Sequence, residues 1–290
     1  MGPTLVLRTS NRIDAPQTVE INTVGFSVGQ LWRSIAQAYR LGAKTIRVKY
    51  EDKQLVYKRL GRKLRVRQEI EFIVTTLLGM EINRVTDDLI VIQQFGEALD
   101  QEFDNALRRA FFKLEEEIDD VVKALQLMDY ELMRQVWMVS ERNLGRFCNF
   151  MLRVLHTKGY ADYAKTDTLY ATVVQLELLG DSLYQIASNV ANQKLKKVPP
   201  ELLKGLFLVK KGFQHYVKYF YTHDEKQIAL LTDAREQIRE IVDSAGVHDS
   251  KTASVITRLD FASEILGNMY DYAITSHNVE EDLSDSARSL

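Results

Sequence analysis

Apolar residues recur at intervals of three and four positions through most of the chain after Leu99. This is the spacing of helices that bury one face, as in the run Leu107, Ala110, Leu114 and Ile118. The pattern predicts helices over residues 99–126, 130–157, 163–195, 199–222, 224–245 and 250–279. The short connections between them are typical of antiparallel neighbours in a helical bundle.

The first part of the chain follows a different pattern. Apolar and basic residues alternate over Thr45–Tyr50, which indicates a half-buried strand. Ser27–Leu41 has helical spacing and is followed by Gly42, a residue type common just after a helix end. Extended segments are predicted at Thr18–Ile21 and at Leu55–Lys58, and we expect the second of these to pair with the strand over Thr45–Tyr50.

Two further segments complete this N-terminal part. Val66–Asn83 is predicted to be one helix with a weak point at Gly79, because glycine is a poor helix former. Asp88–Gln94 is short and rich in β-branched residues, so we expect a strand or an extended crossover there. Residues 1–95 are therefore predicted to form a small α+β module with a connecting helix.

The sequence of the third predicted helix is repeated in the sixth. Glu177-Leu-Leu-Gly-Asp181 corresponds to Glu264-Ile-Leu-Gly-Asn268. Upstream of each, Ser140-Glu141-Arg142 corresponds to Thr232-Asp233-Ala234. Such a repeat predicts two three-helix units in tandem. The expected domains are residues 1–95, 96–198 and 199–290.

Four stretches, in a fixed order along the chain, carry a resemblance to a known family. The third predicted helix has Glu-x-x-Gly-Asp followed by Ile-Ala-x-x-Val, over Glu177–Val190. The other stretches are Leu31–Gly42, Leu78–Asn83 running into Asp88–Gln93, and Gly145–Leu155 with Arg146 and Arg153. Together they cover most of the chain and resemble the archaeal branch of the PhoU-like family of phosphate uptake regulators.

This resemblance implies a mainly α fold, in which a tandem pair of PhoU-like three-helix bundles follows the α+β module. It implies a protein that is not an enzyme and that forms a homodimer, as some members of the family do. Such a protein acts as a negative regulator of phosphate uptake through contact with the ATPase of a phosphate ABC transporter, peripherally at the membrane. The N-terminus has no signal-peptide pattern and no apolar run is long enough to span a membrane, so we expect a cytoplasmic location. Archaeal members often begin with an AbrB-type DNA-binding module, of which this chain retains only the tail end, around Leu5–Arg8.

The resemblance also implies paired acidic side chains that hold metal ions. Residues four apart on a helix share a face, so two carboxylates placed this way offer oxygen ligands to a divalent cation or to iron. Glu177 and Asp181 form a full pair, whereas the other pairs have lost one acid, as where Glu264 faces Asn268. The candidate ligands are Glu141, Glu177, Asp181, Asp233, Glu264 and Asn268. Solvated or salt-bridged helix residues, with Arg142 or Arg146 as partners of the full pair, would explain the same pattern.

Basic residues gather between Arg40 and Arg67, against only Glu51 and Asp52. Such a run could contact nucleic acid or another phosphate-rich partner, or it could be the solvated face of a small hairpin. The candidate contact residues are Arg47, Lys49, Lys58, Arg59, Arg62, Lys63 and Arg65. A DNA-associated transcriptional regulator is therefore an alternative function, and a metal-binding helical bundle is another.

Composition and the absence of known motifs narrow the possible functions further. The net charge of −2 is too small to make the whole molecule an electrostatic binder of nucleic acid. The single cysteine, Cys148, allows no intrachain disulfide. No phosphate-binding loop, nucleophile elbow or His-Glu-x-x-His sequence is present, so we expect no catalysis. No uncharged apolar run of about 18 residues is present to span a membrane.

Two local clusters have simple interpretations. The acidic residues Glu115, Glu116 and Glu117, with Asp119 and Asp120, are interpreted as a helix exterior. Aromatic residues crowd the end of the fourth predicted helix, where a core or a seam between bundles explains them, with a partner-docking surface as the alternative. They are Tyr216, Tyr219, Phe220 and Tyr221.

Overall fold

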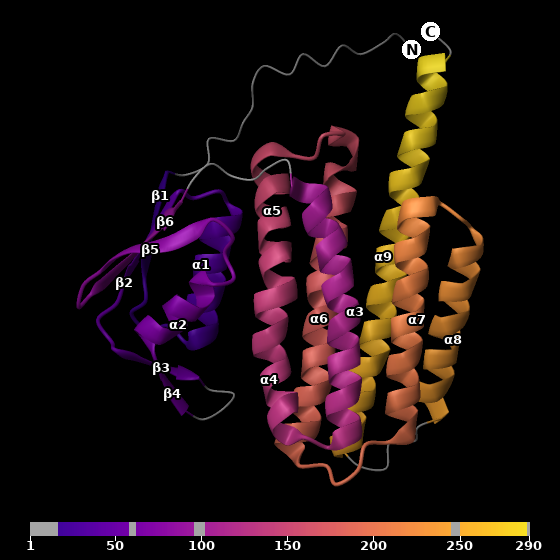
Figure 1. Ribbon diagram of the computed structural model, residues 1–290, viewed down its shortest axis with the longest axis horizontal. Coiled ribbons are helices and arrows are strands. Elements are labelled where there is room, and N and C mark those ends of the chain that lie inside the picture. Colours follow the sequence, from indigo (N-terminus) through magenta and orange to yellow (C-terminus); the bar gives the residue numbers. More distant parts are fainter. Residues whose placement is uncertain (1–16, 58–61, 96–101, 245–249, 289–290) are drawn as a thin grey trace. The chain divides into compact units, whose positions relative to one another are not determined.

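The computed structural model describes residues 17–57, 62–95, 102–244 and 250–288. It divides into two compact units. The first contains the residues up to Gln101 together with Leu152–Ala161, and the second contains Glu102–Met151 and the residues from Asp162 onward. The structure is mainly helical with a small N-terminal sheet, so the predicted mainly α class is confirmed (Figure 1). The expected DNA-binding remnant at Leu5–Arg8 lies outside the described residues.

A four-stranded sheet in the order β1-β2-β6-β5 lies at the centre of the first unit. Its strands are β1 Thr18–Asn22, β2 Thr45–Lys49, β5 Met80–Val85 and β6 Leu89–Gln94. β1 pairs in parallel with β2, while β2 with β6 and β5 with β6 are antiparallel. Ile46 lies opposite Ile92 and Val48 opposite Ile90, and all four are fully buried. The strands predicted over 18–21, 45–50 and 88–94 are therefore confirmed.

Helices α1 (Val28–Arg40) and α2 (Val66–Val74) pack on this sheet and on each other. α1 begins at a capping box, in which the Ser27 hydroxyl accepts from the backbone N–H of Gln30 and the Gln30 side chain accepts from that of Ser27. Its buried stripe contains Leu31, Ile35 and Tyr39, at the spacing that predicted the helix.

The helix predicted over Val66–Asn83 is wrong in its second half. α2 ends at Val74, and the hydroxyls of Thr75 and Thr76 donate to the carbonyls of Phe72 and Ile73, at 2.6 and 2.7 Å. These bonds compete with helix continuation. Gly79 then adopts a φ of +76°, which admits the chain into β5.

The pairing predicted for Leu55–Lys58 is also wrong. β3 (Gln54–Tyr57) pairs antiparallel with β4 (Arg62–Arg65), and the two strands form a separate two-stranded sheet. β2 cannot accept β3 because both of its edges are taken, by β1 on one side and β6 on the other.

The second unit is built from helices whose positions mostly agree with the predicted ranges to within a few residues. They are α3 Phe103–Leu127, α4 Tyr130–Ser140, α6 Thr166–Gln193, α7 Pro200–Thr222, α8 Lys226–Ser244 and α9 Ser250–Arg288. The exceptions are the second helix, which is interrupted, and the sixth, which continues to Arg288 instead of ending near residue 279. α3, α4 and α6 contact one another and are called the first trio; α7, α8 and α9 do the same and are called the second trio. α6 runs alongside α9 with the most extensive contact between helices, and α3 packs on α7 (Figure 1).

The helix predicted over 130–157 is interrupted. A π-helical segment, η3 (Glu141–Gly145), separates α4 from α5 (Arg146–Lys158). A short 3₁₀ turn, η4 (Tyr163–Lys165), likewise precedes α6. Such π segments often occur at functional sites, and apolar periodicity does not reveal the single inserted residue.

Aromatic rings fill the seam between α3 and α7. Phe111 of α3 lies with its ring centroid 5.4 to 6.0 Å from those of Phe213, Tyr216, Phe220 and Tyr221. Phe111, Phe213 and Tyr216 are buried, while Tyr221 is 49% exposed at the edge. The interpretation of this aromatic cluster as a seam is confirmed.

Candidate functional site

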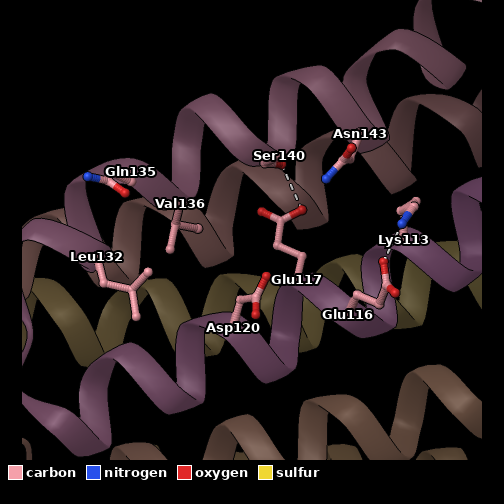
Figure 2. A pocket seen from close by; sticks show the side chains of 9 residues that line it. All are labelled: Lys113, Glu116, Glu117, Asp120, Leu132, Gln135, Val136, Ser140 and Asn143. Carbon is pink, nitrogen blue, oxygen red and sulfur yellow. Dashed lines mark hydrogen bonds and ion pairs between the residues drawn. The ribbon is translucent and has the colours of Figure 1, made fainter.

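A pocket of about 100 Å³ opens between α3 and α4 of the first trio (Figure 2). α3 contributes three carboxylates and one ammonium group, and the facing α4 and η3 contribute amide, hydroxyl and apolar side chains. The lining residues are Lys113, Glu116, Glu117, Asp120, Leu132, Gln135, Val136, Ser140 and Asn143. Lys113 Nζ lies 2.5 Å from Glu116 Oε2, so part of the negative charge is compensated locally.

Glu117 is the buried acid of this pocket, with 6% of its surface exposed. Its Oε2 accepts a 2.7 Å hydrogen bond from the Ser140 hydroxyl, which joins α3 to α4 (Figure 2). A carboxylate removed from water is costly unless hydrogen bonds replace its hydration, so this bond matters for the local fold. The expectation that Glu115–Asp120 is wholly a helix exterior is therefore wrong at Glu117. The signal was present, because Glu117 lies three residues after Leu114 and four before Val121, on the apolar stripe.

Gly180 of α6 lies directly against this hydrogen-bonded pair. A Cβ at position 180 would lie 3.3 Å from Glu117 Oε2, 3.6 Å from Ser140 Oγ and only 2.7 Å from Leu144 Cδ2. Glycine is thus the residue that lets α6 approach α3 and α4 closely enough to close the interior of the first trio.

We expect Gly180→Ala to lower the free energy of unfolding of the helical unit by about 1–3 kcal/mol, because overpacking outweighs the better helix propensity of alanine. Gly29→Ala in α1 is the matched control, since a Cβ at position 29 meets no atom within 4 Å. That variant should gain about 0.5–1 kcal/mol. Amide hydrogen exchange in α6 and in α1 measures the two changes separately, and equal gains at both sites would contradict the close contact.

The acidic pair predicted in the first trio does not line the pocket. Glu177 is half-buried and Asp181 is exposed on α6, one residue beyond Gly180. Glu141 begins the π-helical segment, and its side chain lies outside what the structure describes. The spacing of four residues that places two side chains on one face applies to an α-helix, so it does not hold for Glu141 in this π-helical segment.

In the second trio, the predicted carboxylate Glu264 has arginine partners. Its Oε1 lies 2.8 Å from an Arg239 nitrogen and its Oε2 lies 3.6 Å from one of Arg235. The hydrogen bond from Arg239 is the main cause that holds the pKa of Glu264 below its usual range. Asp233 accepts a 2.8 Å hydrogen bond from Gln237, and Asn268 is exposed.

These contacts argue against a metal ion bound by Glu264. The arginines place positive charge where a cation bound by Glu264 would lie, so this set does not fit a metal. Among the residues described, no three His, Cys, Asp or Glu side chains gather in an arrangement that could hold one. A metal bound through Glu177 and Asp181 stays a prediction.

The basic segment of the first unit divides into two groups. Arg47 and Lys49 on β2 form ion pairs with Glu20 of β1, at 3.2 and 3.1 Å. Lys63 and Arg65 on β4 are exposed. Lys58 and Arg59 lie outside the described residues, and of Arg62 only the backbone is described, in β4.

Arg153 of α5 performs a role that the periodicity did not reveal. Its guanidinium donates to the carbonyls of Tyr39, Ala43 and Gly42 at 2.5, 3.2 and 3.1 Å, and to the Gln94 side chain at 3.0 Å. It also lies over the Tyr39 ring, 4.8 Å from the centroid. All these residues belong to the first unit. A cation thus satisfies the carbonyls at the end of α1, where the helix dipole favours positive charge.

Burial shifts the pKa values of Arg153 and Tyr39. Removal from water lowers the pKa of Arg153 and raises that of the Tyr39 hydroxyl, which donates to the Leu78 carbonyl at 2.9 Å. Arginine titrates so far above neutrality that it stays charged here at physiological pH. The contact is therefore a permanent positive anchor and not a pH switch.

No helix within the described ranges is both long and apolar enough to cross a membrane. No protein-family model, curated protein or solved structure matches the chain.

Proposed function

We propose that this protein is a PhoU-like negative regulator of phosphate uptake, which acts through contact between its helices and the ATPase of a phosphate ABC transporter. In this proposal the two trios are a tandem pair of three-helix bundles. The chain itself catalyses nothing, forms a homodimer and associates with the membrane through its partner.

The proposal is supported chiefly by a packing contact that occurs in both trios. In each, a glycine of the third helix packs against side chains from the second helix or, in the first trio, also from the π-helical segment η3 that follows it. Gly180 of α6 lies against Ser140 and Leu144, and Gly267 of α9 lies against the guanidinium of Arg235, whose Cζ would be 2.4 Å from a Cβ there. The two glycines occupy the same place in the repeated Glu-x-x-Gly sequence, so sequence repeat and packing repeat agree. This is the arrangement that a tandem duplication of one helical unit would produce.

Exposed aromatic side chains supply candidate contacts for a protein partner. Phe112 on α3 is 60% exposed and Phe207 on α7 is 55% exposed, each on the first helix of its trio. A lysine ammonium lies near each ring, Lys113 at 5.5 Å and Lys211 at 4.7 Å from the centroid. Aromatic residues are enriched in the buried centres of protein interfaces and provide much of their binding energy.

Affinity capture of the tagged protein from its native cells, grown in high and in low phosphate, tests this proposal. We expect mass spectrometry to identify a phosphate-transporter ATPase, recovered more strongly from cells in high phosphate. The double variant Phe112→Ala with Phe207→Ala should reduce that recovery by about tenfold or more, if each ring contributes on the order of 1 kcal/mol. Phe95→Ala, which removes a 72% exposed ring from the first unit, is the matched control and should leave recovery unchanged. Captures without the ATPase at both phosphate levels would refute the proposal.

A further inference from the structure

The hairpin of β3 and β4 has one face in the core and one in solvent. Leu55 and Leu64 are cross-strand partners; Leu55 is buried and Leu64 packs half-buried against the core of the first unit. On the opposite side, Gln54 pairs with Arg65 and Val56 pairs with Lys63, and all four side chains are exposed. Cross-strand partners share a face of a sheet, so these four residues form one surface, called the outer ribbon face.

The segment that contains this hairpin is strongly basic. From Lys53 to Gln68 the sequence contains basic residues and no acidic residue, although the whole chain has a net charge of −2. The basic residues are Lys53, Lys58, Arg59, Arg62, Lys63, Arg65 and Arg67. A strongly basic segment in a nearly neutral chain indicates a polyanionic partner.

The described basic side chains of this segment differ in whether the structure gives them a partner. Arg67 forms a 2.8 Å ion pair with Glu71, and Lys53 donates to the Asp87 carbonyl. Within the described residues, Lys63 and Arg65 make no ion pair. Their side chains project from the same face of one strand, about 7 Å apart, as residues i and i+2 of any strand do.

We propose that the outer ribbon face binds duplex DNA, with Lys63 and Arg65 contacting phosphates and Gln54 and Val56 facing the groove. A two-stranded ribbon fits the major groove of B-form DNA, where Gln can hydrogen-bond a base and a small apolar side chain can contact a thymine methyl group. Duplex RNA has a major groove too narrow for such a ribbon. A membrane surface would call for large apolar side chains, and this face offers only Val56.

The test is fluorescence anisotropy of the full chain with a labelled duplex DNA of about 25 base pairs, between 50 and 200 mM salt. The wild type should bind with an affinity that falls as salt rises. Lys63→Gln with Arg65→Gln should weaken binding roughly 60-fold at 0.1 M salt and reduce the slope of log affinity against log salt by about 2, the effect of two lost phosphate contacts.

The matched control is Arg47→Gln with Lys49→Gln, which removes the same number of positive charges from two side chains that are both ion-paired with Glu20. This variant should keep affinity within about threefold of wild type, since the contribution of such paired surface charges is small. Duplex RNA of the same sequence and vesicles containing anionic phosphatidylglycerol are the competitors. Absence of DNA binding at 50 mM salt, equal effects of the two double variants, or preference for RNA or vesicles would each overturn the proposal. None of these outcomes bears on capture of a transporter ATPase by the helices.

Discussion

Arg153→Ala is expected to lower the stability of the first unit by about 3 kcal/mol. The substitution removes a donor from three main-chain carbonyls at the end of α1 and from the Gln94 side chain. Of the three carbonyls, that of Tyr39 keeps the Gly42 backbone N–H as a donor. Buried acceptors left without a donor each cost about 1–3 kcal/mol, and water entering the vacated space would recover part of that loss. Because the chain has two units, amide hydrogen exchange in α1 and β6 measures the effect better than a single unfolding midpoint.

Two further variants define the cause of that loss. Arg153→Lys keeps the positive charge, but the lysine ammonium lacks the planar guanidinium and cannot donate to all three carbonyls at once. This variant should therefore recover less than half of the stability that Arg153→Ala loses. Arg134→Ala removes an exposed arginine whose ion pair with Glu131 spans 3.7 Å, and it should change stability by less than about 0.5 kcal/mol. Equal protection of α1 in Arg153→Ala and wild type would show that the guanidinium contacts are not stabilising.

Phe111→Ala is expected to destabilise the helical unit by about 3–5 kcal/mol. Its ring is 3% exposed and contacts four aromatic rings of α7, so truncation leaves a cavity in the seam that joins the first trio to the second. Edge-to-face ring contacts add to the area that is lost. Amide hydrogen exchange in α3 and α7 measures the change, because it reports on the helical unit separately from the first unit.

The neighbouring residue supplies the control for that experiment. Phe112→Ala removes the same side chain from the next position of α3, where the ring is 60% exposed. It should cost less than about 1 kcal/mol. Similar losses for the two variants would mean that the seam does not depend on the ring of Phe111.

The helices of the second unit could be predicted because their signal is local. Apolar spacing located α3, α7 and α8 to within a few residues, although none of α3, α6 and α7 ends at a glycine: Met128, Lys194 and His223 adopt the left-handed conformation instead. The predictions that proved wrong concern features that depend on residues far away in the sequence. The pairing of β3 is decided by β1 and β6, which occupy both edges of β2, and no local pattern records that.

The candidate sites were predictable only in part, for the same reason. Glu264 has the right spacing for a paired ligand, but Arg235 and Arg239 come to it from another helix. Glu117 is an acid on an apolar stripe, a visible signal whose meaning depends on Ser140 of α4. Arg153 binds residues more than 100 positions away in the sequence, so only the folded chain reveals its role.

The most direct test of the proposed regulatory function is the rate of phosphate uptake by cells that lack this protein, measured in high external phosphate. A negative regulator predicts that uptake stays high in the deletion cells and falls again when the wild-type chain is restored. The Phe112→Ala with Phe207→Ala variant should fail to restore that fall, whereas Phe95→Ala should restore it. Uptake that is equally low with and without the protein would contradict the proposed function.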